Sequence, residues 1–151
     1  MAANLVWDTG IWDTNQWLGK KMLLDAVGTM LSTVASTGTT STYRLFKTFM
    51  PDTPDKVMVL YETGGFPPDS IQHGLDQPTF SVHVRGTYST AREKLNEAFN
   101  LLHQINRSTA GGSTEKFISI VAVGDALSLG RDTKNRPVIS QNFRALRERS
   151  T

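Results

Sequence analysis

Apolar residues recur at helical spacing in two stretches of the chain, residues 16–35 and residues 90–105. The first stripe consists of Leu23, Val27, Met30, Leu31 and Val34, and the second of Leu95, Ala98, Leu102 and Ile105. Side chains three or four positions apart share one face of an α-helix. Thr90 and Glu93 also fit a capping box, with Thr90 as the N-cap. The pattern therefore predicts two amphipathic helices, each with one buried face.

Other stretches have the pattern of β-strands. Residues 57–61 are apolar at every position, as in a strand in the middle of a sheet. Phe80, Val82 and Val84 alternate with polar residues up to Gly86, which is typical of a half-buried strand. The remaining predicted strands are residues 43–50, residues 117–123, and the arms 127–131 and 138–146 of a hairpin that turns at residues 132–135.

Glycine and proline interrupt this pattern between residues 64 and 68. Gly64, Gly65, Phe66 and Pro67 precede a second proline, and the run predicts a loop with unusual backbone geometry. The predicted order is then a helix, three strands, a helix and two or three strands. This order implies an α+β fold: a two-layer sandwich in which two helices cover one face of an antiparallel or mixed sheet of four to six strands.

The first 16 residues do not fit this domain pattern. Trp7, Trp12 and Trp17 recur every five residues, a period that matches neither a helix face nor a strand face. Each Trp has a large apolar area to bury. We therefore expect residues 1–16 to form an N-terminal aromatic arm and residues 17–151 to form one domain. The arm either folds back on its own domain or docks on a neighbouring chain.

Composition narrows the possible functions. The 151-residue chain has no Cys, which excludes a disulfide scaffold, a cysteine nucleophile and thiolate metal sites. Its net charge of +2 is divided unevenly, because residues 131–151 carry six basic and two acidic residues while the other 130 residues carry ten basic and twelve acidic. A basic terminal segment indicates either a surface that faces DNA or an acidic partner, or a solvated charged strand.

Known catalytic and cofactor motifs find little support. Asp8-Thr9-Gly10 has the residues of an aspartic protease loop but does not follow an apolar strand, and the three histidines share no ligand spacing. No phosphate-binding loop and no Gly-x-Ser-x-Gly motif occurs in the sequence. No signal-peptide or membrane-span pattern is visible either. We therefore predict a cytoplasmic, non-enzymatic protein with no catalytic residue, no metal, no cofactor and no membrane partner.

Three segments, taken in order, resemble a family of tailed-phage neck proteins, the tail terminators or minor capsid proteins of long-tailed phages. The first is the apolar strand at residues 57–65 followed by Pro67-Pro68. The second is residues 77–86, a strand that ends in Arg85, followed by Tyr88 and the Ala-x-x-Lys start of a helix. The third is the hairpin with Leu-Gly-x-Asp at residues 129–132, Arg-Pro at 136–137 and Asn-Phe-Arg at 142–144.

The resemblance implies a structural virion protein. Such terminators form a sixfold homo-oligomeric ring that caps the tail tube and joins it to the head connector. The implied partners are the tail tube protein and the head-closure protein, with DNA passing through the lumen without specific binding. The protein would be made in the host cytoplasm and be located in the tail or neck. Another neck component, a tail tube subunit and a nucleic-acid-binding module remain as alternatives.

Within this interpretation, three groups of residues are candidate contacts of the ring. The aromatic arm and the segment of residues 64–67 are expected at subunit or tube contacts, because their aromatic residues lie outside the periodic core. The basic residues near the C-terminus are expected to face an acidic partner or DNA. The candidate residues are Trp7, Trp12, Trp17, Gly64, Gly65, Phe66, Pro67, Arg131, Arg136, Arg144 and Arg147.

Overall fold

The computed structural model describes residues 23–36, 43–67, 75–103, 105–109 and 116–148. These residues form two helices and six strands: α2 (Leu23–Ser36), β1 (Arg44–Lys47), β2 (Val57–Phe66), β3 (Leu75–Arg85), α3 (Tyr88–Leu102), β4 (Ile105–Thr109), β5 (Lys116–Arg131) and β6 (Pro137–Glu148). The predicted aromatic arm, with its three Trp, lies outside the described residues.

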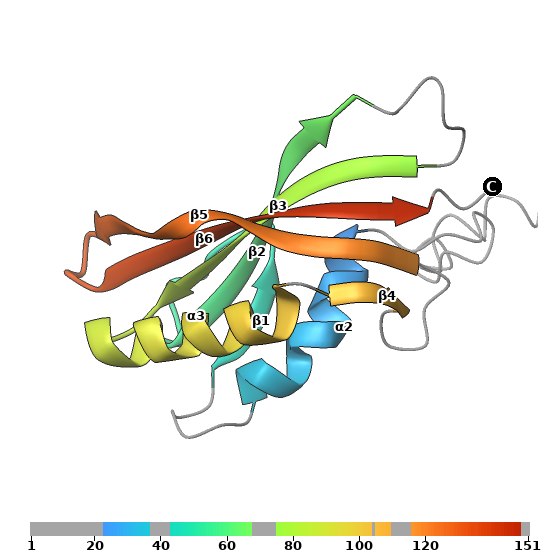
Figure 1. The fold of residues 1–151 in the computed structure, drawn as a ribbon. Coiled ribbons are helices and arrows are strands. Elements are labelled where there is room, and N and C mark those ends of the chain that lie inside the picture. The colour runs from blue at the N-terminus through green and yellow to red at the C-terminus, as the bar shows by residue number, and fades with distance from the viewer. Residues whose placement is uncertain (1–22, 37–42, 68–74, 104, 110–115, 149–151) are drawn as a thin grey trace, which may run out of the picture.

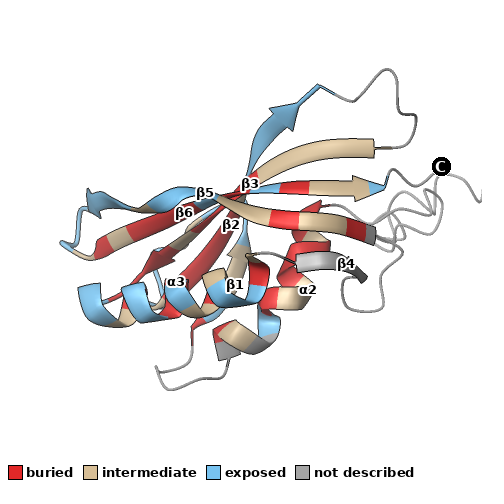
Figure 2. Ribbon diagram, viewed as in Figure 1, coloured by how far each residue is buried: buried red, intermediate tan, exposed pale blue. Residues whose placement is uncertain are grey.

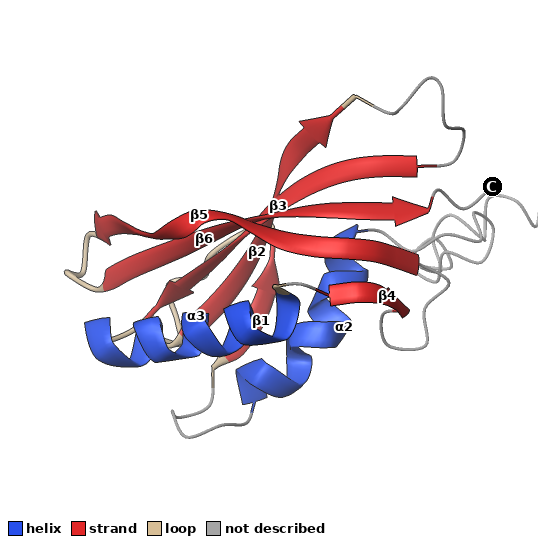
Figure 3. Cartoon of the chain, viewed as in Figure 1, coloured by secondary structure: helices blue, strands red, loops and turns tan. Residues whose placement is uncertain are grey.

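The six strands form one mixed sheet with the order β1-β2-β3-β6-β5-β4. Only β1 and β2 are parallel, and every other neighbouring pair is antiparallel. Both helices lie on the same face of the sheet, as Figures 1 and 3 show, with α2 against β1 and β2 and α3 against β3, β5 and β6. The predicted two-layer α+β fold is therefore confirmed.

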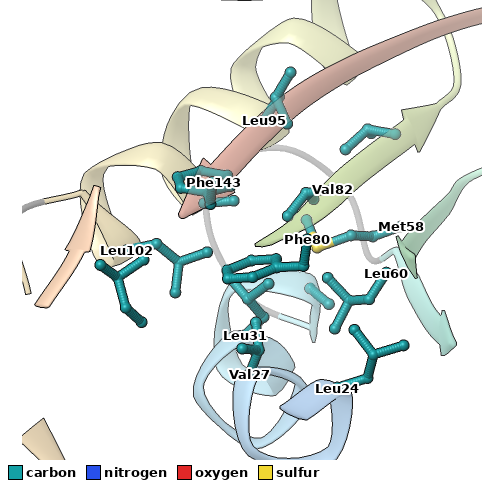
Figure 4. Packing of buried hydrophobic residues seen from close by; sticks show 14 of the residues in the cluster. Leu24, Val27, Leu31, Met58, Leu60, Phe80, Val82, Leu95, Leu102 and Phe143 are labelled. Carbon is teal, nitrogen blue, oxygen red and sulfur yellow. The ribbon is translucent and has the colours of Figure 1, made fainter. Parts of the chain in front are cut away.

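The core lies between the helices and this face. Phe80 of β3 and Phe143 of β6 are fully buried and stack with their ring centroids 5.4 Å apart. Figure 4 shows the Phe80 ring beside Leu31 of α2, with Leu102 of α3 also in the cluster. Burying a side chain of this size contributes roughly 1.5–3 kcal/mol, so the cluster provides the main attraction between the two layers. The apolar stripes read from the sequence are the helix faces that enter this core.

The N-cap of α3 lies three residues before the predicted one. It is Thr87, and Thr90 lies inside the first turn, so the predicted capping box was wrong. The Thr90 hydroxyl instead accepts a hydrogen bond from the hydroxyl of buried Tyr43 at 3.0 Å and lies 2.6 Å from the Thr87 hydroxyl. A tertiary contact thus uses the oxygen that the local pattern assigned to capping. Ile105, expected on this helix, belongs to β4 instead.

The glycine-rich segment after residue 63 continues β2, so the predicted loop at residues 64–66 was wrong. Gly64, Gly65 and Phe66 pair with β3 after a bulge that follows Glu62. Gly64 and Gly65 have φ values of 94° and 138°, which L side chains rarely adopt. The unusual backbone expected there exists, but it serves a bulged strand rather than a loop.

The strands after α3 also differ from the prediction. β4 was not predicted, and β5 is one continuous strand that includes both predicted segments, residues 117–123 and 127–131. The bulged region of β5 between Val123 and Leu127 accounts for the apparent break in the pattern. The predicted hairpin turn at residues 132–135 is confirmed, with Asn135 at φ 62° and its N–H donating to the Asp132 carbonyl at 2.9 Å.

Burial divides the sheet into two regions, as Figure 2 shows. The central strands are buried, whereas the end of β2 and the hairpin half of β5 are exposed. Among the described residues, no helix is long and apolar enough to span a membrane.

Candidate functional site

The basic C-terminal segment does not form one patch, because β6 separates its two groups of arginines. Arg136 directly precedes this 12-residue strand, and Arg144 and Arg147 lie near its other end. At about 3.3 Å per residue, the strand is roughly 36 Å long. Arg131 and Arg136 therefore lie at the hairpin turn, at the opposite end of the sheet from the other two.

Arg136 is the centre of an ionic cluster at the hairpin turn. Its guanidinium donates to Asp132 Oδ2 at 2.8 Å, to Asp55 Oδ1 at 2.7 Å, and to both the side chain and the carbonyl of Asp52, at 2.9 and 2.7 Å. The hydrogen bonds that Arg136 donates to Asp132 and Asp55 raise the pKa of Arg136, and the Arg136 side chain lowers the pKa of Asp132. Lys134 also pairs with Asp52 and lowers its pKa.

Arg85 lies beneath this cluster and is only 2% exposed. It donates to three backbone carbonyls of the β1–β2 connection, those of Asp52 at 3.2 Å, Pro54 at 2.7 Å and Asp55 at 3.2 Å. Burial lowers the pKa of Arg85, and Asp132 lies 3.9 Å away. A buried arginine with several acceptors fixes the backbone that it contacts.

We call Asp52, Asp55, Arg85, Asp132, Lys134 and Arg136 the turn cluster. Its three carboxylates face three cations, so the cluster is neutral overall. The cluster joins the β1–β2 connection to the turn of the β5–β6 hairpin through contacts between residues 81 to 84 positions apart in sequence. Its chemistry is therefore structural, and the Arg136 charge that we expected to face a partner is matched within the chain.

Lys94, another basic residue of the family-like signatures, is also structural. It lies on α3, its side chain has no exposed area, and its ammonium donates to the Val34 carbonyl at 2.8 Å and to Glu97 Oε2 at 3.1 Å. A cation at the C-terminal carbonyls of α2 is favoured by the helix dipole. Lys94 thus attaches the two helices to one another. Sequence reasoning missed the burial of Arg85 and Lys94, because charged residues are rarely fully buried.

The opposite end of the sheet carries the glycine-rich segment and Arg144, two of the predicted contact groups that the structure describes. Gly64, Gly65, Phe66 and Pro67 are all exposed there, with 54% of Phe66 accessible. The Arg144 guanidinium lies 5.8 Å from the centroid of the Phe66 ring, within the range of a cation–π contact.

This Phe66–Arg144 pair borders a depression of about 250 Å³. The depression is lined by Thr63, Phe66, Thr79, Val123, Asn142, Phe143 and Arg144. Its wall is mostly apolar, and Val123 is half exposed. The structure therefore brings the glycine segment and Arg144 together in one exposed surface, which the sequence had placed in separate groups.

Arg147 lies near this surface but does not contribute a fully exposed charge. Its side chain is 11% exposed, and its Nε lies 3.9 Å from Asp76 Oδ2 on β3. Of the predicted contact residues that the structure describes, Arg131, Arg144 and the segment of residues 64–67 are exposed, whereas Arg136 and Arg147 are partly buried beside carboxylates.

The described histidines have structural environments. His83 packs on Tyr61 with ring centroids 4.7 Å apart, and burial lowers the pKa of His83. His103 Nδ1 accepts the Ala122 N–H at 3.1 Å. Within the described ranges, no three His, Asp or Glu side chains are placed to hold a metal ion.

The described residues thus carry the neutral turn cluster at one end of the sheet and the exposed Phe66–Arg144 pair at the other. The comparisons with known proteins identify the family. A family model described as bacteriophage tail terminator protein matches residues 22–149, so the chain belongs to the bacteriophage tail terminator family. The resemblance noted in the sequence is confirmed, and the protein is a structural component of a phage tail.

A solved structure shows that the fold recurs in another protein. One chain of the virion of a native gene transfer agent particle superimposes with a TM-score of 0.59 at 18% identity, covering 83% of this chain and 94% of that chain. At this identity the likeness concerns the fold alone. No curated protein gave a significant match.

Proposed function

We propose that this protein forms a ring, of six copies, on the top of a finished tail tube. The ring stops tube polymerisation and presents a surface to the head-closure protein, and DNA passes through its lumen without specific binding. The observation that carries this proposal is the family match over residues 22–149, which includes every described element. The neutral turn cluster also supports it, because paired charges leave less attraction for passing DNA.

The Phe66–Arg144 surface is our candidate for the contact with the tube or the head-closure protein. An exposed aromatic ring under a guanidinium offers apolar area together with one positive charge, a combination enriched in protein interfaces. Arg131 at the hairpin turn is a second exposed cation, with its Nη1 donating to the Asn135 carbonyl at 2.8 Å. The Trp-bearing arm keeps its proposed role at a subunit or tube contact.

Deletion of the gene, followed by complementation, tests the function. Without the protein, we expect overlong tails that do not join heads, as seen by negative-stain microscopy, and wild-type protein should restore tails of uniform length. Tails of normal length that fail only to join heads would indicate another neck component. The absence of any tube would indicate a tail tube subunit.

The same complementation tests the surface. The variant with Phe66→Ser and Arg144→Glu should fold but restore few joined particles. It removes the aromatic side chain of residue 66 and reverses the charge of residue 144. Arg92→Glu, on the exposed side of α3, makes the matched charge change elsewhere and should complement fully. Full complementation by the Phe66/Arg144 variant would place the contact on another surface.

A further inference from the structure

The hairpin half of β5 is an exposed sheet edge. β4 pairs with β5 only from Lys116 to Ile120, and within the described part of the chain no strand pairs with the outer side of β5 beyond Ile120. We call residues 121–131 the β5 edge. Figure 1 shows this half of β5 extending past the end of β4, and Figure 2 shows its exposure.

The composition of the β5 edge is unlike that of a protected edge strand. Val123, Leu127 and Leu129 are 50%, 60% and 49% exposed, and Asp125 is the one charged residue before Arg131. Exposed edges usually carry several charges or prolines, which prevent pairing with another chain. An exposed apolar edge indicates a surface that a partner covers.

The other edge of the sheet is β1. We call residues that pair from strand to strand across the sheet a row, and β1 lies in the same rows as the β5 edge. Phe46 pairs with Val59, Val59 with His83, His83 with Ser140, and Ser140 with Leu127. Residues paired across a sheet point to the same face, so Phe46 and Leu127 share the face that is free of helices. β1 therefore lies level with the exposed part of β5 and not with the part that β4 covers.

The two edges also match in chemistry. Phe46 packs on Phe49, which is 58% exposed, so the β1 edge offers aromatic area where the β5 edge offers leucine. Lys47 lies in the row of Leu60, Val82 and Gln141, and this row meets the bulge of β5 that contains Asp125. The Lys47 ammonium also pairs with Asp25 of α2 within its own chain. The charged residues of β1 are basic and the only charged residue of the β5 edge before Arg131 is acidic.

The strand directions are compatible with pairing between copies. β1 and β2 are parallel and the next three neighbouring pairs are antiparallel, so β5 runs opposite to β1. A second copy in the same orientation would thus bring its β1 antiparallel to the β5 edge. Because β1 and the β5 edge lie in the same rows, the second copy needs no shift along the strand direction to make this contact. A head-to-tail contact closes into a ring when it repeats by rotation without translation, and forms a filament otherwise.

We propose that the β5 edge binds the β1 edge of a second copy of this chain, with Leu127 of one copy against Phe46 and Phe49 of the next. The sheet then continues from subunit to subunit. This inference rests on the proposed ring and names the surfaces that join its subunits.

Disulfide cross-linking in assembled tails tests the contact. Because the chain has no native Cys, only the introduced cysteines of this protein can form the cross-link. Neighbouring antiparallel strands have Cα atoms about 4.5–5.5 Å apart, within the range that a disulfide spans. Mild oxidation of tails with the Phe46→Cys, Leu127→Cys variant should give a ladder of covalent multimers up to the full ring. Each single variant should remain monomeric on the gel. The Leu101→Cys, Leu127→Cys variant is the matched control, because Leu101 is exposed on α3, and it should also remain monomeric.

Each other result has a defined meaning. Dimers from Leu127→Cys alone would show that the β5 edge pairs with itself and would overturn the proposal. A ring visible by microscopy without cross-links would overturn this contact and leave the terminator function intact, whereas tails of normal length in the deletion strain would overturn the function itself. If the double variant does not fold, the Leu127→Glu variant provides the test. This variant should not be incorporated into the ring, and its normal incorporation would overturn the proposal.

Discussion

Arg85 provides a direct test of the turn cluster, because it joins the cluster to the sheet. We predict that Arg85→Met, which keeps most of the side-chain volume but removes the charge, lowers the free energy of unfolding substantially. Arg85→Lys, which keeps the charge, should also destabilise the protein. The physical reason is geometric: a planar guanidinium reaches three carbonyls at once through two nitrogens, whereas the single ammonium nitrogen of lysine cannot.

The magnitude follows from the contacts. A hydrogen bond to a charged group contributes about 1.5–3 kcal/mol, and only the bond to the Pro54 carbonyl is short, at 2.7 Å. The two bonds at 3.2 Å are weaker, and the exposed β1–β2 connection can replace part of the loss with water. We therefore expect a loss of about 2–4 kcal/mol for Arg85→Met and about half of that for Arg85→Lys.

Urea denaturation monitored by circular dichroism measures this loss. For a chain of this size, each kcal/mol also lowers the Tm by roughly 2–4 °C. Arg92→Met, an exposed arginine on α3, is the matched control and should change the stability by less than about 0.5 kcal/mol. If Arg85→Lys were as stable as the wild type, the three-carbonyl geometry would not stabilise the fold and the reasoning would be refuted.

Two further predictions concern the glycine bulge and the buried histidine. Gly65→Ala should lower the free energy of unfolding by at least about 1 kcal/mol more than Gly64→Ala. Both residues have positive φ, but only at Gly65 would a Cβ lie 2.5 Å from the Gln77 carbonyl oxygen. Equal losses of stability in urea denaturation would contradict this. Burial lowers the pKa of His83 below its ordinary 6.5, so the unfolded chain binds a proton more readily and stability should fall as the pH drops below about 6.5. His83→Gln should reduce this decline between pH 7 and 5, and an unchanged pH profile would argue against it.

Much of the fold could be read from the sequence because its signals are local. The spacing of Val27 and Leu31 on α2, the alternation of Phe80 and Val82 on β3, and the turn before Arg136 depend only on neighbours along the chain. These signals were sufficient for the fold class, and the ordered motifs were sufficient for the family. The contacts proposed for the aromatic arm remain predictions.

The tertiary structure decided where charges and strand ends meet. Arg136 belongs to a basic segment in the sequence, but folding places it against Asp52 and Asp55, whose positions are more than 80 residues away. Gly64 and Gly65 are residues typical of a loop, but they pair with β3 and form part of a bulged strand. The local sequence predicts Thr90 as a helix cap, but in the folded protein its hydroxyl accepts a hydrogen bond from Tyr43.

The level of β1 relative to the β5 edge likewise follows only from the register of four neighbouring strand pairs. Periodicity along a chain therefore determined which residues face the core of this protein. Pairing across the chain decided which charges are neutralised and which apolar side chains remain exposed for a partner, because these contacts join residues that carry no mutual signal in the sequence.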